Sequence, residues 1–146
     1  MQTLENHIVI IGFGRLGHQI AKGLKNRNVD YIIIEGNELK FNYGKQDNEP
    51  IIFGNATQTN ILLAANIRKA RSVFISIGNI RKIVNICSAI RQMNENIKII
   101  IKVHTHEEKI MLEQEFLHNI SVAVETEETA KIMLLTAQNM LATDHD

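Results

Sequence analysis

The chain has 146 residues, of which 45% are hydrophobic and 22% charged, and its sixteen basic residues balance its sixteen acidic ones. This length and composition predict one domain with its own core, and the balanced charge excludes a general attraction to nucleic acid or to an anionic membrane. No apolar stretch approaches the ~20 residues that span a bilayer and no signal peptide precedes the first predicted strand, so we expect a soluble, cytosolic domain.

A glycine pattern near the N-terminus is the most informative motif. A short apolar strand over residues 7–11 runs into Gly12-x-Gly14-x-x-Gly17, and an amphipathic helix follows. In such a turn the first glycine allows a tight reversal, the second lets the backbone approach a pyrophosphate, and the third lets the helix pack against the sheet. The helix also directs its N–H groups and the positive end of its dipole toward the phosphate. The motif therefore predicts a nucleotide phosphate site.

The second predicted strand, residues 29–35, ends in an acidic residue. Glu35 lies within the roughly 20-residue window expected for the carboxylate that binds an adenosine ribose. A carboxylate accepts hydrogen bonds from ribose hydroxyls and repels a 2′-phosphate, which favours NAD(H), AMP, ADP or ATP over the phosphorylated dinucleotide. The alternative is that Glu35 only ends a strand in solvent.

The rest of the chain alternates between helix and strand patterns. The polar segment 36–49 predicts a short or irregular helix, and residues 50–54 predict a brief third strand. Further strands are expected at 72–77, 97–103 and 120–124, and helices around 60–65, 79–93, 107–117 and 126–140. Successive βαβ units with right-handed crossovers predict an α/β, Rossmann-like, doubly wound parallel six-stranded sheet in the order 3-2-1-4-5-6, with helices on both faces. We expect residues 1–146 to form this single domain.

This organisation favours binding over catalysis. A dehydrogenase needs residues beyond its cofactor domain to bind a second substrate and to transfer a proton. Here the six predicted strands and their helices take up the given sequence and leave no segment for these roles. The alternative is the cofactor domain of an NAD-dependent oxidoreductase, in which only Lys102, His104 or Glu125 could act as the acid or base. The fold alone does not assign chemistry.

The element Gly54-Asn-Ala-Thr57 completes a resemblance to a known family. Together with the glycine turn and the acid after strand two, it resembles the TrkA-N, or RCK N, domain, the regulator of potassium conductance in Trk and Ktr uptake proteins and in Kef-type cation:proton antiporters. The similarity covers about residues 7–140. The segments Gly12–Gly17 and Glu125–Ala130 look most like the Kef-type branch.

The resemblance implies a regulatory role. It implies a domain that binds NAD(H) or AMP and gates ion transport through a transmembrane antiporter or transporter domain, on the inner face of the bacterial plasma membrane. It also implies a homodimer, and the exposed faces of the last two helices are the expected contact surfaces. No catalytic residue is expected.

The resemblance also implies four groups of ligand-binding residues. They are the phosphate turn Gly12, Phe13, Gly14, Arg15, Leu16 and Gly17; the ribose group Glu35, Gly36 and Asn37; the adenine side Gly54, Asn55, Ala56 and Thr57; and the cleft floor Ser76, Ile77 and Gly78. Two places depart from the family's usual pattern. Asn55 stands where Asp is usual, and Lys102 and His104 stand where arginines are expected.

Several other side chains are candidates for a site or for the core. Arg15 in the first turn of the phosphate helix predicts a phosphate or ribose contact, with a solvent-facing arginine as the alternative. His18 is expected to be a surface or packing residue, and the basic turn 68–71 a solvated one. The single cysteine, Cys87, falls on the buried side of a predicted helix and is expected in the core.

Three histidines raise the question of a metal site. His104 and His106 have the spacing that places two imidazoles on one side of a strand, and His118 follows in the next loop. No cysteine supports the group and the strand ends there, so we predict no metal site.

Overall fold

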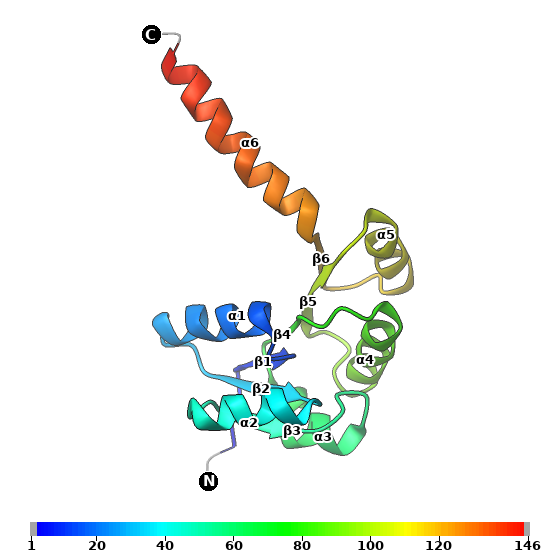
Figure 1. Cartoon of the computed structure of the whole chain (residues 1–146). Coiled ribbons are helices and arrows are strands. Elements are labelled where there is room, and N and C mark those ends of the chain that lie inside the picture. Colours follow the sequence, from blue (N-terminus) through cyan, green and yellow to red (C-terminus); the bar gives the residue numbers. More distant parts are fainter. Residues whose placement is uncertain (1–2, 145–146) are drawn as a thin grey trace.

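The computed structural model describes residues 3–144, which form one parallel β-sheet flanked by helices (Figure 1). The strands are hydrogen-bonded in the order β3-β2-β1-β4-β5-β6, which confirms the prediction. In chain order the elements are β1 Ile8–Ile11, α1 Arg15–Asn26, β2 Tyr31–Glu35, α2 Glu38–Gln46, β3 Ile51–Phe53, α3 Thr59–Ala64, the 3-10 helix η1 Ile67–Lys69, β4 Ser72–Ile75, α4 Ile80–Met93, β5 Lys98–Val103, α5 His106–Glu115, β6 Ile120–Val124 and α6 Glu125–Asp144.

The centre of the sheet is buried on both faces. All four residues of β1 are buried between β2 and β4, as expected for a parallel strand that is covered on both sides. One hydrophobic cluster joins Ile10 and Ile33 of the sheet to α1 and α2. The larger cluster joins their neighbours Val9 and Ile11 to α3, α4 and α5 on the opposite face, and includes Cys87, as predicted. Successive residues of a strand point to opposite faces, so β1 contributes to both clusters.

Three helices begin at residues whose side chains cap them, namely α2, α4 and α5. The side chains of Asn37 and Asn79 accept hydrogen bonds from backbone N–H groups in the first turns of α2 and α4, at 3.0 and 3.1 Å. At α5, Thr105 and Glu108 form a reciprocal capping box. Each such cap satisfies an N–H group that the helix itself cannot pair.

The helix α2 is short, which is one of the two alternatives that the sequence predicts. The polar segment predicts a short or irregular helix, and Glu38–Gln46 is a continuous helix of nine residues. It packs through Gly44, where an added Cβ would lie 2.8 Å from the Ile51 side chain and 3.4 Å from that of Phe13. A helix that approaches the sheet through a glycine needs few large apolar residues, which explains the weak periodicity.

The last helix does not cover the sheet. It begins at Glu125, directly after Val124 of β6, and runs to Asp144, beyond the predicted end at 140. Figure 1 shows α6 extending away from the rest of the molecule. Its large apolar side chains are between 51% and 69% exposed; they are Ile132, Met133, Leu134, Leu135, Met140 and Leu141.

The direction of α6 leaves part of one sheet face open. In β4, β5 and β6 the residues Phe74, Ile100 and Ala123, on the same face as α1, are only half-buried. A groove of about 410 Å³ lies beside Phe74 and is also lined by Ile20 and Leu24 of α1. The structure therefore exposes both an apolar helix and an apolar strip of sheet.

Candidate nucleotide-binding site

A cavity lies at the carboxyl ends of β1, β2 and β4. The strand order reverses at β1, which pairs with β2 on one side and with β4 on the other. Open α/β sheets bind their ligands at such a point. The cavity has a volume of about 750 Å³ and is lined by Ile11, Gly12, Gly14, Ile34, Glu35, Gly36, Asn37, Lys40, Phe53, Gly54, Asn55, Ala56, Gln58, Ser76, Ile77, Gly78, Asn79, Lys82 and Ile86.

Two glycines of the turn are required by the fold itself. Gly12 has φ +105°, a conformation that side chains of L-residues rarely adopt, and a Cβ there would lie 2.6 Å from Ser76 Oγ. A Cβ on Gly17 would lie 2.0 Å from the carbonyl oxygen of Gly12, so the helix can approach the turn only through a glycine.

Gly14 is different. It has φ −86° and ψ −157°, which other residues adopt without strain, and a Cβ there would meet only Lys40 Nζ, at 3.8 Å. The fold without a ligand therefore does not require a glycine at this position. The space above Gly14 belongs to the cavity.

Glu35 is buried at the end of β2, with 8% exposure. Its Oε1 accepts a hydrogen bond from the Phe13 backbone N–H and its Oε2 from that of Asn37, both at 2.8 Å. The alternative of an acid that merely ends a strand in solvent is therefore wrong. A carboxylate has about four acceptor sites, so two bonds leave Glu35 with acceptors on the cavity side.

The loop after β3 closes another side of the cavity. Asn55 Oδ1 accepts hydrogen bonds from the backbone N–H and the hydroxyl of Thr57, at 2.9 and 2.8 Å. These bonds fix the oxygen of Asn55 within the loop. The amide group of Asn55 is a pair of donors that an Asp at this position would lack.

The end of β4 holds the glycine turn in place. Ser76 Oγ lies 3.1 Å from the carbonyl oxygens of both Ile11 and Gly12, so its single hydroxyl proton is shared between these two acceptors. Ser76, Ile77 and Gly78 all line the cavity. The imidazole of His104 lies next to Gly78, because an added Cβ there would be 3.2 Å from His104 Nε2.

Not every residue implied by the resemblance lines the cavity. Phe13 contributes its backbone N–H to Glu35, but its side chain is buried in the core beside α1 and α2. Arg15 and Leu16 are exposed on α1, and Gly17 and Thr57 support the loops behind the cavity wall. The remaining eleven implied residues all line it.

Sequence reasoning missed two lysines at the cavity. Lys40 of α2 and Lys82 of α4 both line it, and no ion pair engages either side chain within residues 3–144. Lys82 lies in the first turn of α4, the helix that follows β4, and a lysine at this helix start was the signal that the sequence offered. Lys40 could not be found in this way because its segment is poorly periodic and predicts only a short or irregular helix.

Cys87 is buried, and two of the histidines considered for a metal site lie beside carboxylates. Burial raises the pKa of the Cys87 thiol to about 12. His104 lies 3.7 Å from Glu125, and His106 lies 3.0 Å from Glu127. In the described part of the chain, no three His, Cys, Asp or Glu side chains gather to hold a metal ion.

Two surface predictions can also be placed. The side chain of His18 is 40% exposed and its ring lies 5.6 Å from that of Phe13, so it has both surface and packing character. In the basic segment 68–71, Arg68, Lys69 and Arg71 are exposed. None of the helices described between residues 3 and 144 is long and apolar enough to cross a membrane.

The fold and the cavity together define a class of protein. The sheet is doubly wound, with a glycine turn, a buried acid at the end of β2 and an open cleft at the reversal of strand order. These features place the chain among the Rossmann-like domains. Residues 8–124 match the sequence model of the TrkA-N domain, and the chain belongs to this family. The resemblance seen in the sequence is thus confirmed.

Related sequences occur in potassium channels and antiporters. The chain is 35% identical over 104 residues to potassium channel protein 1 of Methanocaldococcus jannaschii, covering 70% of this chain and 31% of that protein. It is 26% identical over 138 residues to the putative K(+) efflux antiporter KefB of Alkalimonas amylolytica, covering 94% of this chain and 20% of that protein. The chain therefore spans a third or less of the length of these relatives.

Solved structures share the fold. The TrkA-N domain of inner membrane protein ybaL from Escherichia coli superposes with a TM-score of 0.81 at 24% identity, covering 91% of this chain and 97% of that one. The AMP-bound form of the Shewanella denitrificans Kef CTD gives a TM-score of 0.75 at 18% identity, covering 93% and 81%. At these identities the likeness concerns the fold alone.

Proposed function

We propose that this chain is a regulatory domain that binds an adenine nucleotide, NAD(H) or AMP, and controls a potassium or cation:proton transport protein. The observation that carries the proposal is Gly14. The fold explains the other two glycines of the turn, whereas a side chain on Gly14 would meet only the end of a flexible lysine. A glycine there is explained by a ligand that lies against the backbone.

The cavity offers partners for each part of an adenine nucleotide. The N-terminus of α1 and the ammonium groups of Lys40 and Lys82 supply positive charge for phosphates. Glu35 supplies acceptors for the ribose hydroxyls and repels a 2′-phosphate. Asn55 supplies an amide at the adenine side. The structural neighbour from Shewanella denitrificans is an AMP-bound form, which supports the same ligand class here.

A binding role fits the chain better than an oxidoreductase. The residues considered as acid or base pair with one another, because Lys102 and His104 both lie within 4 Å of the Glu125 carboxylate, at 3.9 and 3.7 Å. The relatives are a channel and an antiporter rather than dehydrogenases. We therefore assign regulation of transport from the cytoplasmic face of the bacterial plasma membrane, through a transmembrane partner in the same or another chain.

The apolar surface of α6 supports a homodimer. Ile132 to Leu135 are four consecutive large apolar residues, and successive residues of a helix point about 100° apart. Because these four side chains point in different directions around the helix, a single flat surface cannot cover all of them. The half-buried strip around Phe74 and Ile100 is where a doubly wound sheet would carry a further helix. We infer that a second copy covers both, with α6 laid across the partner's sheet and the exposed face of α5 alongside.

A thermal-shift titration tests the nucleotide. The purified chain is titrated with AMP, ADP, ATP, NAD⁺, NADH and NADPH. Saturation at about 100 times the dissociation constant stabilises a native-state site by about 2.7 kcal/mol, which is roughly 5–10 °C for a domain of this size. Stabilisation by AMP or NAD(H), with NADPH inactive, supports the proposal. No shift with any nucleotide at millimolar concentration overturns it.

A further inference from the structure

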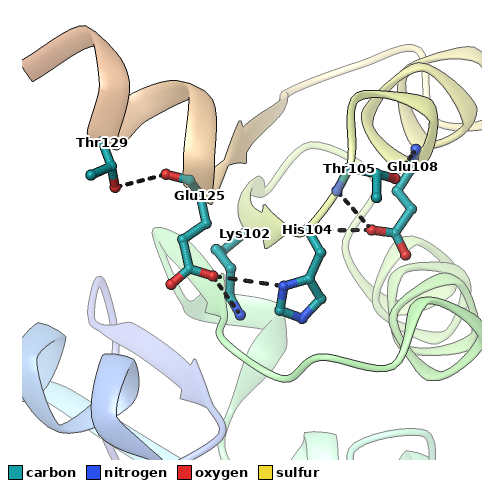
Figure 2. Close-up of polar contacts among 6 residues, drawn as sticks. All are labelled: Lys102, His104, Thr105, Glu108, Glu125 and Thr129. Carbon is teal, nitrogen blue, oxygen red and sulfur yellow. Dashed lines mark hydrogen bonds and ion pairs between the residues drawn. The ribbon is translucent and has the colours of Figure 1, made fainter. Parts of the chain in front are cut away.

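One histidine lies between the cleft and the projecting helix. His104 follows β5 directly, and Figure 2 shows its ring beside the carboxylate of Glu125, the first residue of α6. His104 Nδ1 is 3.7 Å from Glu125 Oε2. The other ring nitrogen, Nε2, faces Gly78 on the cleft floor, 3.2 Å from the position that a Cβ on Gly78 would occupy. Gly78 lines the cavity and His104 lies just behind it, so one ring nitrogen faces a residue of the cavity lining and the other faces the base of α6.

Polar contacts join the first turn of α6 to β5 and α5. Glu125 Oε2 also lies 3.9 Å from Lys102 Nζ, and Glu127 Oε2 lies 3.0 Å from His106 Nδ1. No loop separates β6 from α6, so the position of Glu125 sets the direction in which the helix leaves the sheet. These contacts hold the base of a helix whose remaining length projects from the domain (Figure 1).

The charge state of His104 decides how many of its neighbours can accept a hydrogen bond from its ring. A neutral imidazole donates from one nitrogen only, whereas the imidazolium donates from both. The titratable and charged groups around it are Glu125 on α6, Lys102 on β5 and Glu108 on α5, whose Oε1 accepts a hydrogen bond from the His104 backbone N–H at 3.0 Å. Only the protonated ring can donate toward Glu125 and toward an anion above Gly78 at the same time.

We propose that protonated His104 couples anion binding in the cleft to the orientation of α6 relative to the sheet. The coupling rests on the proposed function, because the anion is the phosphate of the bound nucleotide. A phosphate near Gly78 favours the imidazolium, and the imidazolium strengthens the pair with Glu125, which holds the base of α6 in one orientation. Coupling between two sites is reciprocal, so holding α6 in this orientation also raises the affinity for the nucleotide. Lys102 Nζ, 3.9 Å from Glu125 Oε2, gives this carboxylate a second partner beside His104.

Nucleotide affinity at two pH values gives the first test. The dissociation constants of NAD⁺ and AMP are measured by calorimetry at about pH 6 and about pH 8, the range over which histidine changes charge. The wild type is compared with His104→Gln, and with His118→Gln as a matched control in a loop away from the cleft. We expect two- to fivefold tighter binding at the lower pH in the wild type and in the control, as for one exposed ion pair, and no such change in His104→Gln. Because every variant meets the same ligand, the comparison removes the titration of the phosphate itself.

The orientation of α6 gives the second test. Spin labels are placed on cysteines introduced at Gln92 of α4 and Gln138 of α6, both on the outside of the domain, in the wild-type and His104→Gln backgrounds. Cys87 stays unlabelled because it is buried and its thiol pKa is raised to about 12. Labelled chain is diluted with unlabelled chain so that pulsed dipolar spectra report distances within one chain. At the lower pH, we expect nucleotide to narrow the distribution of distances between the two labels in the wild type. We expect no such narrowing in His104→Gln.

The outcomes separate the coupling from the proposed function. If the wild type binds nucleotide but His104→Gln shows the same pH dependence and the same change in α6, the coupling is overturned and the nucleotide site stands. If the wild type binds neither nucleotide, the proposed function fails and the coupling fails with it.

Discussion

Replacing Gly14 with alanine tests the reasoning behind the nucleotide site most directly. The added Cβ would meet only Lys40 Nζ, at 3.8 Å, which is an ordinary contact. Gly14 is the N-cap of α1, where alanine is less favourable than glycine by about 0.5–1 kcal/mol. Restricting the unfolded chain offsets this by about 0.4–1 kcal/mol. The free energy of unfolding without ligand should therefore change by less than about 1 kcal/mol.

The same methyl group should have a large effect on binding. A phosphate that contacts the Gly14 backbone cannot keep its distance with a Cβ in between, and each charge-assisted hydrogen bond that is lost is worth about 1.5–3 kcal/mol. We expect the dissociation constant of NAD⁺ or AMP to rise at least tenfold, which corresponds to about 1.4 kcal/mol. Urea unfolding followed by circular dichroism measures the first quantity, and calorimetry measures the second.

Gly17→Ala is the matched control within the same turn. Its Cβ would lie 2.0 Å from the carbonyl oxygen of Gly12, so we expect this variant to be strongly destabilised or unfolded even without ligand. The contrast between the two alanines separates a glycine required by the fold from one required by a ligand. If Gly14→Ala binds nucleotide as tightly as the wild type, the ligand does not lie on this backbone and the reasoning is refuted.

Three further predictions concern other parts of the molecule. Glu35→Gln replaces one carboxylate oxygen by an amide donor, which leaves one of the two N–H groups now bonded to the carboxylate without a partner. The free energy of unfolding measured in urea should therefore fall by about 1–3 kcal/mol. An unchanged free energy of unfolding would contradict a structural role for both bonds. The double change of Leu134 and Leu135 to lysine should convert a dimer to a monomer in analytical ultracentrifugation without loss of secondary structure, because both side chains lie outside the core; a persistent dimer would mean that α6 is not the interface. Cys87 should react with a thiol reagent at about pH 8 at least a hundredfold more slowly in the native protein than in urea, because burial raises its pKa to about 12, and equal rates would exclude that burial.

Short-range patterns predicted most of the fold. The strand, the glycine turn and the helix around Gly12–Gly17 are adjacent in the sequence, and so is Glu35 at the end of its own strand. Their conformations depend on local periodicity and on residue types that tolerate few alternatives. The strand order followed because right-handed crossovers leave few topologies for alternating helices and strands. The last strand, Ile120–Val124, has the predicted bounds.

Patterns without strong periodicity predicted less. The segment around Gly44 gave little helical signal because a glycine, rather than large apolar residues, brings α2 to the sheet. The apolar residues of the terminal helix predicted a helix but not what it packs against. An amphipathic pattern requires that a surface be covered and does not say whether the same chain covers it.

The sequence by itself therefore determined the Rossmann-like frame, the family and the glycine and acid positions of the cleft, because these depend on contacts between neighbours in the chain. Tertiary structure alone decided that Lys40 and Lys82 reach the same cavity, that Gly14 is the glycine the fold does not need, and that His104 lies between Gly78 and Glu125. Each of these depends on where separate strands end relative to one another. The periodicity of a short segment does not determine the distances between residues of separate strands and helices. The parallel sheet determines them, because it brings the carboxyl ends of its strands to one edge.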